Sequence, residues 1–306
     1  MYTPGGVNLT KKKEEQQEEI ILPEPVDFLS GLDEIKNDLI IRSKKGTITY
    51  GIEILDDCVE FIRPCTMTLI AACPNVGKSL LAQNMACHIA KQGKKVLFCS
   101  CEMTVGLLME RQLKQLMNLT STQMMSMYEH SPSLLDDQFD IVRTDSEYEY
   151  IHRIKVLDIG GMHVDTLLKV LDKYNDYEYV IVDYIQRLHG EGPSKYEKLA
   201  DVSYKLQIYA MQHDRAMIVC AQIPKTVEID ARGEKKGIDF NAMRVKGAGE
   251  MEEDAHVAIK MIEEYKEGKK YVLINLSKSK YGDKKLLTYR YKISPRLTFD
   301  LIEKDI

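Results

Sequence analysis

One short segment constrains the fold of this chain more than any other. Ala72-Cys-Pro-Asn-Val-Gly-Lys-Ser79 follows an apolar run that starts at Thr66, and it leads directly into a helical pattern. The segment fits the motif G-x-x-x-x-G-K-[ST], with alanine in place of the first glycine. A loop of this kind points backbone N–H groups at phosphate oxygens where a helix begins. The sequence therefore predicts an α/β fold with a phosphate-binding loop over residues 72–79.

Each residue type in this loop has a chemical reason. Gly77 lets the backbone approach the ligand, Lys78 reaches the β and γ phosphates, and the Ser79 hydroxyl binds Mg²⁺. Ala72 is acceptable if its position needs a small side chain and not a positive φ. The expected ligand is ATP with Mg²⁺. The loop residues predicted to bind it are Ala72, Cys73, Pro74, Asn75, Val76, Gly77, Lys78 and Ser79.

Two carboxylates follow strand-like runs and are candidates for the same site. Tyr179-Val-Ile-Val-Asp183 is an apolar strand that ends in an acid, which suits a Walker B carboxylate that orders Mg²⁺ through water beside Ser79. The alternative for Asp183 is an acid that caps a helix. Glu102 follows the run Val96–Ser100 and is placed to accept a proton from an attacking water. The alternative for Glu102 is an acid at a helix start, stabilised by the helix dipole. From spacing alone both roles stay open.

From about residue 47 onward, strand-like and helical patterns alternate, which predicts a mainly parallel sheet flanked by helices. After residue 255, strand-like segments follow one another, joined by the charged turns EEYKEGKK and KYGDKK. They predict an antiparallel extension at one sheet edge. The strand-like runs are Thr66–Cys73, Lys95–Ser100, Lys155–Ile159, Tyr179–Tyr184, Ala216–Gln222, His256–Ile262, Tyr271–Lys278 and Leu286–Lys292, and the helical patterns cover about 78–92, 104–118, 163–175 and 196–213.

The first 46 residues differ from the rest in their pattern of charged and apolar residues. Residues 1–26 mix charges without apolar periodicity, which is typical of a disordered tail. Residues 29–43 place apolar side chains at helical spacing and predict a short amphipathic helix. This helix is expected to pack either on its own domain or on a neighbour's. The predicted organisation is a tail with a linker helix over 1–46 and one ATPase domain over 47–306.

Composition narrows the class of protein further. A net charge of −5 over 306 residues excludes a surface that is basic all over, so any contact with nucleic acid must be local. Cys73, Cys99, Cys101 and Cys220 sit in or beside apolar runs, which favours core thiols in a reducing cytosol. No apolar stretch approaches ~18 residues. We therefore expect a cytoplasmic protein without a membrane segment.

Several motifs occur in an order that resembles a known family. After the phosphate-binding loop come Ser100-Cys-Glu-Met103, Ile181-Val-Asp-Tyr-Ile-Gln186, Cys220-Ala-Gln222, Gly249-Glu-Met-Glu-Glu-Asp-Ala255 and Lys278-Ser-Lys-Tyr-Gly282. Together they resemble the motif series of the C-terminal motor domain of DnaB-type replicative helicases, over about residues 47–300. The resemblance implies a RecA-like P-loop NTPase fold and an ATP-driven DNA helicase. Because few residues precede this part, the family's N-terminal helical domain is expected to be missing.

The resemblance assigns roles to residues outside the phosphate-binding loop. It implies that Glu102 is the general base and that Gln222 senses the γ-phosphate; for Gln222, a buried amide at a sheet edge is the alternative. Lys278 and Lys280 stand where the family supplies a lysine and an arginine finger to the ATP of the next subunit. Lysine lacks arginine's bidentate fork, so two solvated lysines beside a turn remain an alternative. With Lys78, these four residues form the predicted catalytic set.

A long polar connection, Pro224–Gly249, follows Gln222. A loop of this length inside a compact domain is usually functional or disordered. In the resembled family it lines a central channel and grips the DNA backbone, whereas a mobile surface loop is the alternative. The predicted nucleic-acid-binding residues are Lys225, Arg232, Lys235, Lys236, Arg244 and Lys246.

The resemblance also implies an assembly and partners. It points to a ring, a hexamer in the family, that moves along single-stranded DNA during replication, with a primase or a helicase loader as further candidate partners. Two other functions stay open. The paired lysines also resemble those of RecA-like recombinases, which form filaments on DNA. A non-unwinding ATPase that regulates or loads a helicase would suit the acidic net charge.

Overall fold

The computed structural model of this chain divides into two units, residues 1–46 and residues 47–306. In the first unit, Leu32, Ile35 and Leu39 are helical, as the periodicity predicts, and their side chains are exposed. The predicted disorder of residues 1–26 lies outside the described residues. The structure describes residues 47–117, 119–223, 249–281 and 287–306, together with isolated positions between residues 29 and 39.

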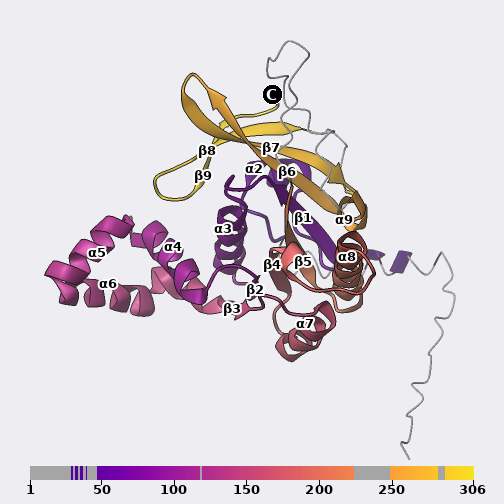
Figure 1. Cartoon of the computed structure of the whole chain (residues 1–306), viewed down its shortest axis with the longest axis horizontal. Coiled ribbons are helices and arrows are strands. Elements are labelled where there is room, and N and C mark those ends of the chain that lie inside the picture. Colours follow the sequence, from indigo (N-terminus) through magenta and orange to yellow (C-terminus); the bar gives the residue numbers. More distant parts are fainter. Residues whose placement is uncertain are drawn as a thin grey trace, which may run out of the picture. The chain divides into compact units, whose positions relative to one another are not determined.

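A nine-stranded sheet runs through the described part of the second unit, in the order β3-β2-β4-β5-β1-β6-β7-β8-β9 (Figure 1). In this order, the first six strands, from β3 at one end through β6, pair in parallel with their neighbours. The pairs β6–β7, β7–β8 and β8–β9 are antiparallel. The predicted parallel sheet with an antiparallel edge is confirmed. The strands are β1 Thr66–Ala72, β2 Val96–Ser100, β3 Ile154–Asp158, β4 Tyr179–Asp183, β5 Ala216–Gln222, β6 Val257–Lys266, β7 Lys269–Ser279, β8 Thr288–Ile293 and β9 Phe299–Glu303.

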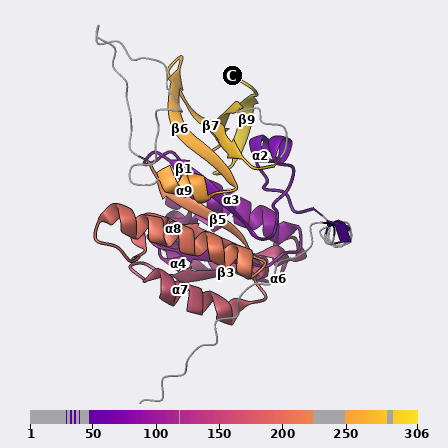
Figure 2. The ribbon, with the colours of Figure 1, turned by 90° about the vertical axis from the view of Figure 1, so that its right-hand side faces the viewer.

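Helices cover both faces of the parallel part, with α3 (Lys78–Lys91) on one face and α8 (Lys195–Gln212) on the other (Figures 1 and 2). The sequence of α3 is rich in alanine, leucine and methionine, which favour helix and here fill the core. Ser194 and Glu197 form a capping box that starts α8. Among the described residues from 47 onward, the other α-helices are α2 Glu53–Cys58, α4 Val105–Met117, α5 Ser121–His130, α6 Pro132–Thr144, α7 Val164–Leu171 and α9 Gly249–Asp254, and the 3₁₀ helices are η2 Ser146–Arg153, η3 Asp172–Tyr174 and η4 Ile185–Arg187.

The core lies against the parallel strands, and every residue of β1, β2 and β4 is buried. Strands covered by helices on both faces read as continuous apolar runs, which is why the sequence located them. Cys73, Cys99, Cys101 and Cys220 are buried free thiols, as expected. Burial raises the pKa of Cys101 to about 12, so its thiol stays neutral. These cysteines are core residues.

The helical hairpin of α5 and α6 was not predicted. It stands away from the sheet (Figure 1), and α5 buries no side chain while α6 buries only Leu135. The sequence did contain a helical signal here, since Leu135, Phe139 and Val142 of α6 recur at helical spacing. The strand β9 at the sheet edge, which buries none of its residues, was also missed.

The predicted turn EEYKEGKK is wrong over most of its length. Strand β6 ends only at Lys266 and strand β7 already begins at Lys269, so the turn consists of Glu267 and Gly268. The Glu263 carboxylate pairs with the Lys270 ammonium across the two strands. The two residues are diagonal neighbours in the register, and opposite charges on neighbouring strands stabilise a hairpin, so a charged stretch forms strand here.

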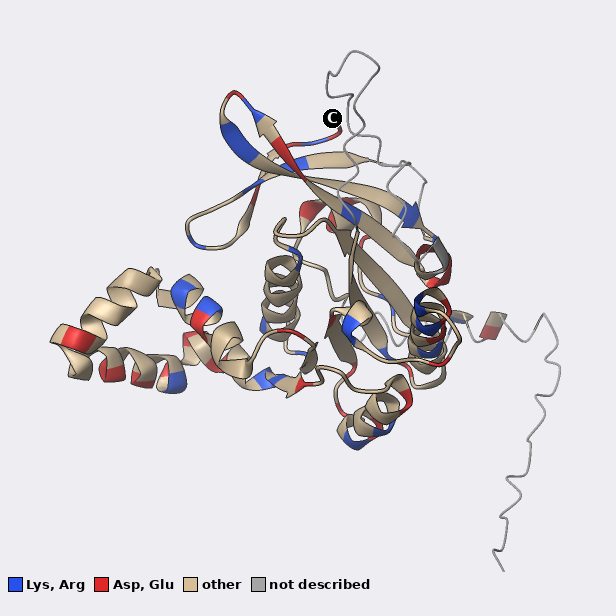
Figure 3. Cartoon of the chain, in the orientation of Figure 1, with Lys and Arg blue, Asp and Glu red and all other residues tan. Residues whose placement is uncertain are grey.

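Acidic and basic residues are interspersed on the elements that the structure describes (Figure 3). This agrees with the small negative net charge of −5. Between residues 47 and 306, none of the described helices has both the length and the apolar character needed to cross a membrane.

Candidate nucleotide site

The predicted phosphate-binding loop joins the end of β1 to the start of α3. Asn75 and Gly77 have positive φ values of 64° and 107°, which asparagine tolerates and glycine adopts readily. A Cβ atom on Gly77 would lie 3.0 Å from Ile293 and 3.2 Å from Phe299, so space as well as backbone favours glycine. Because α3 begins at Lys78, the free amides of its first turn belong to the loop. This is the geometry of an anion site.

Two of the predicted loop residues support the loop and do not line the cleft beside it. Ala72 is the last, fully buried residue of β1, and Val76 is also buried. An extended strand position needs no glycine, which explains why alanine can replace it there. The predicted residues that do line the cleft are Cys73, Pro74, Asn75, Gly77, Lys78 and Ser79.

The Lys78 ammonium forms an ion pair with the carboxylate of Asp183, at the end of β4. Their side chains are only 11% and 3% exposed. Burial works to lower the pKa of Lys78, but the negative charges around it, among them Asp183, leave the pKa above its ordinary value. Buried charges persist when they are paired. The pair therefore places a cation and an anion at the foot of the loop, one suited to phosphate and the other to a metal ion.

The cleft has a volume of about 850 Å³, within the usual range for ligand sites. Besides the loop, its lining includes Glu102 after β2, Tyr184 after β4 and Gln222 at the end of β5. Four parallel strands thus contribute their carboxyl ends to one cleft, which is where open α/β sheets bind ligands.

The residues present fit a nucleoside triphosphate with Mg²⁺. The loop amides and Lys78 supply donors and positive charge for phosphate, as described above. Ser79 and Asp183 offer hydroxyl and carboxylate oxygens, the hard ligands that Mg²⁺ prefers. The two lie beside Lys78, Ser79 as its neighbour in sequence and Asp183 as its ion-pair partner.

Glu102 lies two residues beyond β2, whose last residue, Ser100, pairs in register with Asp183. Its side chain is 52% exposed and lines the cleft. The helix α4 starts only at Val105, so the carboxylate belongs to the loop between strand and helix. The guanidinium of Arg187 faces this carboxylate, with Nη2 3.8 Å from Oε1 of Glu102.

Gln222 ends β5 and its side chain is exposed at the cleft. This does not fit the alternative of a buried amide. Its backbone is held by the side chain of Gln186: the Gln222 N–H donates to Oε1 at 3.1 Å, and Nε2 donates to the Gln222 carbonyl at 3.0 Å.

This fold and this cleft match one family. The family model of the DnaB-like helicase C terminal domain covers residues 47–294. The chain belongs to that family. Among individual relatives, the replicative DNA helicase DnaB of Treponema pallidum is 24% identical over 218 residues, which cover 69% of this chain and 47% of that protein. A probable plasmid replicative DNA helicase of Chlamydia trachomatis is 24% identical over 244 residues, 76% of this chain and 50% of that protein.

The chain thus spans about half the length of the curated relatives it matches. Solved structures extend the likeness to the fold. An ATPase domain solved on its own has a TM-score of 0.74 and 19% identity, and the match covers 92% of this chain and 100% of that one. A DnaB-like replicative helicase studied for its interactions with primase has a TM-score of 0.71 and 18% identity, and the match covers 92% of this chain and 68% of that one. The DnaB-like domain here is therefore a RecA-like ATPase domain in fold.

The two lysines predicted to act as fingers lie toward the amino ends of the parallel strands, which we call the amino edge of the sheet. The nucleotide cleft lies at the carboxyl ends of these strands, the carboxyl edge. Ser279, between Lys278 and Lys280, pairs with Val257, which pairs with Thr68 of β1. Thr68 precedes the end of β1 by four residues, which corresponds to about 13 Å along the strand. The lysines are therefore remote from the phosphate-binding loop of their own DnaB-like domain.

The environments of these two lysines differ. The Lys278 ammonium donates to the carbonyls of Glu252 and Glu253, at 2.6 Å each, and so caps the end of α9. Burial and the charge of Lys280 lower the pKa of Lys278. The Lys280 side chain is exposed at the end of β7. The predicted nucleic-acid residues Lys225, Arg232, Lys235, Lys236, Arg244 and Lys246 lie outside the described residues.

Sequence reasoning missed one wall of the cleft. Leu107, Glu110, Arg111 and Lys114 of α4 line it, and so does Leu297 in the turn between β8 and β9. The four α4 residues have the spacing i, i+3, i+4, i+7 and share one helix face. That spacing was available in the predicted helix over 104–118, but which way the face points depends on tertiary packing.

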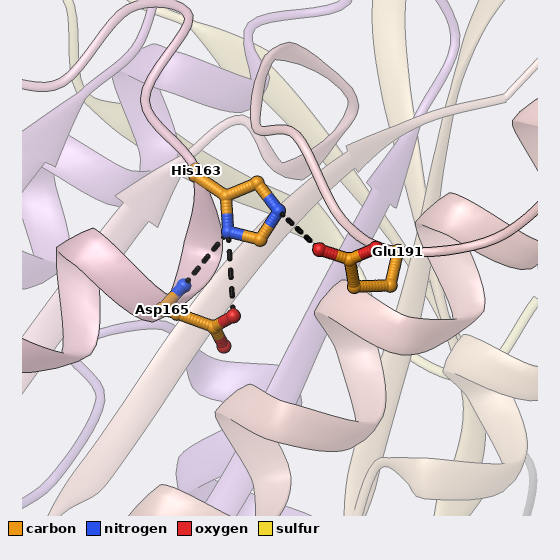
Figure 4. Close-up of side chains that lie close together, drawn as sticks. All are labelled: His163, Asp165 and Glu191. Carbon is orange, nitrogen blue, oxygen red and sulfur yellow. Dashed lines mark hydrogen bonds and ion pairs between the residues drawn. The ribbon is translucent and has the colours of Figure 1, made fainter. Parts of the chain in front are cut away.

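His163 at the start of α7, with Asp165 and Glu191, forms a cluster of ionisable side chains outside the cleft (Figure 4). The ring Nδ1 accepts the Asp165 N–H at 3.4 Å, and Nε2 lies 3.3 Å from the Glu191 carboxylate. The carboxylates face opposite nitrogens of the ring, and Asp165 also pairs with Lys205 at 2.8 Å. We interpret the cluster as a polar network, joined to the Lys205–Asp165 ion pair, that links the loop around Glu191 to the start of α7.

Proposed function

We propose that this chain is the ATP-hydrolysing motor of a ring-forming DNA helicase that translocates on single-stranded DNA during replication. The observation that carries the proposal is membership of the DnaB-like helicase C-terminal domain family, joined to a cleft with the groups that ATP hydrolysis needs. Because the chain spans about half of its curated relatives, unwinding, the ring and the nucleic-acid substrate are part of the proposal.

In the proposed reaction, water attacks the γ-phosphorus of ATP, the bond to the ADP oxygen breaks, and Glu102 takes the proton. Lys78 and the loop amides bind the phosphates and stabilise the charge that develops on them. Ser79 and Asp183 would hold Mg²⁺, which supplies further charge neutralisation when bound. Gln222 lies on the lining of the same cleft and is placed to contact the γ-phosphate.

The position of the lysines supports a site shared between subunits. Lys278 and Lys280 lie about 13 Å along the strands from their own phosphate-binding loop, by the strand register. Fingers at that edge would act on the ATP of another molecule. In the proposed ring, each head-to-tail interface would bring the amino edge of one subunit to the carboxyl edge of the next. We propose a hexamer, with the helix predicted over residues 29–43 docked on the neighbouring subunit.

The proposed nucleic-acid grip is the connection between residues 224 and 249. It carries six cations in a chain whose net charge is −5. It starts just after Gln222, so a shift of that residue toward the γ-phosphate would move the root of the connection. A primase and a helicase loader are the proposed protein partners.

A forked-duplex unwinding assay with ATP tests the proposal, run beside a native mass measurement of the assembly. We expect ATP-dependent strand separation by a hexamer, and no separation by the Lys78→Ala variant. A monomer that neither unwinds a fork nor hydrolyses ATP faster with single-stranded DNA would contradict the proposal. That outcome would favour an ATPase that regulates or loads a helicase.

A second candidate rests on one observation. Lys280 stands where the family has an arginine finger, and a pair of lysines also occurs in RecA-like recombinases that form filaments on DNA. Particle shape in electron micrographs with single-stranded DNA and ATP separates the two functions. Closed rings support the helicase, and open helical filaments support the recombinase.

A further inference from the structure

The short helix η4, Ile185–Arg187, has contacts in two directions. It directly follows β4 and the carboxylate of Asp183. On one side, Arg187 reaches Glu102 beyond β2, and on the other side, Gln186 reaches the backbone of Gln222 at the end of β5. Consecutive residues thus touch two walls of the nucleotide cleft.

The guanidinium of Arg187 is fixed at one end and faces Glu102 at the other. Its Nε donates to the Tyr184 hydroxyl at 2.9 Å, and its Nη2 lies 3.8 Å from the Glu102 carboxylate. Tyr184 is nearly buried, and its ring lies 4.6 Å from the Lys78 ammonium. A tyrosine held in this way fixes the base of the arginine, so the guanidinium position depends on the floor of the cleft.

The contact between Arg187 and Glu102 guides the carboxylate without locking it. A separation of 3.8 Å exceeds that of a hydrogen bond, and both side chains are about half exposed, at 55% and 52%. Ion pairs of this kind contribute little to stability. Their charge still favours one position of a mobile carboxylate over others, and Glu102 can leave it when a water or phosphate approaches.

The contact between Gln186 and Gln222 is tighter than that between Arg187 and Glu102. Its amide makes both a donor and an acceptor bond to the backbone of Gln222, at 3.0 and 3.1 Å. Two bonds from one amide fix the strand end to η4 in position and orientation. The end of β5 is therefore joined to η4, the same short helix that carries Arg187 toward Glu102.

We propose that Arg187 is a positioning residue for ATP hydrolysis, and that η4 couples the position of the Gln222 backbone to Glu102. The inference rests on the proposed function, in which Glu102 accepts the proton from water. A misplacement of about 1 Å in a reacting group can lower a rate by as much as 10²-fold. Arg187 lies just beyond the resembled motif that ends at Gln186.

The test measures kcat and KM for ATP in the full-length chain, with and without a single-stranded oligothymidylate. Arg187→Ala is expected to lower kcat about threefold to thirtyfold with KM within about twofold, because misplacement of the base affects the chemical step. Arg187→Lys should restore part of the loss, and Gln186→Ala should lower stimulation by the oligonucleotide about twofold to fivefold. Arg143→Ala is the matched control: it removes an exposed ion pair with Asp140 on α6 and should leave every parameter unchanged.

The decisive measurement is a double-mutant cycle with Glu102→Gln, followed as single-turnover hydrolysis of labelled ATP. If Arg187 acts through Glu102, Arg187→Ala should change the Glu102→Gln rate by less than about twofold. The full loss persisting in that background would overturn the inference, as would a raised KM with unchanged kcat. If Glu102→Gln stalls but Arg187→Ala has no effect, only this inference fails. If Glu102→Gln hydrolyses ATP at the parental rate, the proposed base fails and the inference with it.

Discussion

The carboxyl and amino ends of the parallel strands carry different kinds of residues. At the carboxyl edge, β1, β2, β4 and β5 bring the phosphate-binding loop, Glu102, Asp183 and Gln222 to one cleft. At the amino edge, the described residues place Lys278 and Lys280 near the start of β6, with Lys278 bonded to carbonyls of α9. One edge holds a nearly complete site, whereas the other holds cations remote from any phosphate of their own chain.

The two ends of the sheet therefore have complementary chemistry. The carboxyl edge has the geometry of an anion site, and the amino edge presents cations. In the proposed assembly, head-to-tail contact between two such surfaces would close into a ring or continue as a filament. Groups that act within one chain and groups that act on a neighbour would respond differently to substitution.

The largest effect is expected for the proposed base at the carboxyl edge. Glu102→Gln should bind ATP as the parent does but hydrolyse it about 10²–10⁴-fold more slowly, because loss of a positioned base affects only the chemical step. Hydrolysis in single turnover and nucleotide binding by fluorescence check this separately. Hydrolysis within a few-fold of the parental rate would show that another group takes the proton.

Loss of Lys78, the residue proposed to bind phosphate at the carboxyl edge, should affect nucleotide binding as well as hydrolysis. Lys78→Ala is expected to lose ATP binding together with hydrolysis, by about 10²–10³-fold. It also leaves the buried Asp183 carboxylate without the cation that pairs with it. Equilibrium binding of a labelled nucleotide measures the first effect directly. Normal affinity in a correctly folded variant would contradict the assigned role of Lys78.

The amino edge is tested by mixing chains. Lys280→Ala alone should lower hydrolysis about tenfold to a hundredfold, since one transition-state donor is lost. Mixing it with Lys78→Ala should restore activity, because some mixed sites take the loop from one chain and Lys280 from the other. The ATPase rate is measured as a function of the mixing ratio. An isolated subunit that hydrolyses ATP at the full rate would contradict a shared site.

The connection at the end of β5 links the carboxyl edge to nucleic acid. Replacement of Lys235, Lys236 and Lys246 by alanine should weaken single-strand binding for all sequences. It should also flatten the dependence of log affinity on log salt by up to about two units, at ~0.7 per phosphate contact. Binding is measured at several salt concentrations. Unchanged affinity and slope would leave the segment as a surface loop, and basal ATPase activity should survive in either case.

The smallest effect distinguishes the two lysines at the amino edge. Lys278→Ala should lower the free energy of unfolding by about 1–2 kcal/mol, because it removes a charged donor from two carbonyls of α9. Lys280→Ala should leave stability within about 0.5 kcal/mol, since its side chain is exposed. Chemical denaturation of both variants gives the comparison. Equal destabilisation would mean that Lys280 also has a structural role.

The parallel strands and the phosphate-binding loop could be predicted from local sequence patterns. Buried strands between two helical layers read as continuous apolar runs, and the loop needs glycine, lysine and serine at fixed spacing, so both appear as local patterns. Asp183 and Glu102 could be proposed as site residues for the same reason, because Asp183 ends one apolar strand and Glu102 follows another.

How those elements meet depends on tertiary packing. The sequence of α6 has apolar residues at helical spacing, but it does not show that the α5–α6 hairpin buries little against the sheet. The α4 wall of the cleft depends on the direction in which a helix face points, and the pairing of Gln186 with Gln222 joins residues 36 positions apart. Lys278 and Lys280 look alike in sequence, yet one caps α9 and the other is exposed. Local patterns record periodicity and spacing, whereas contacts between distant segments depend on packing of the whole domain.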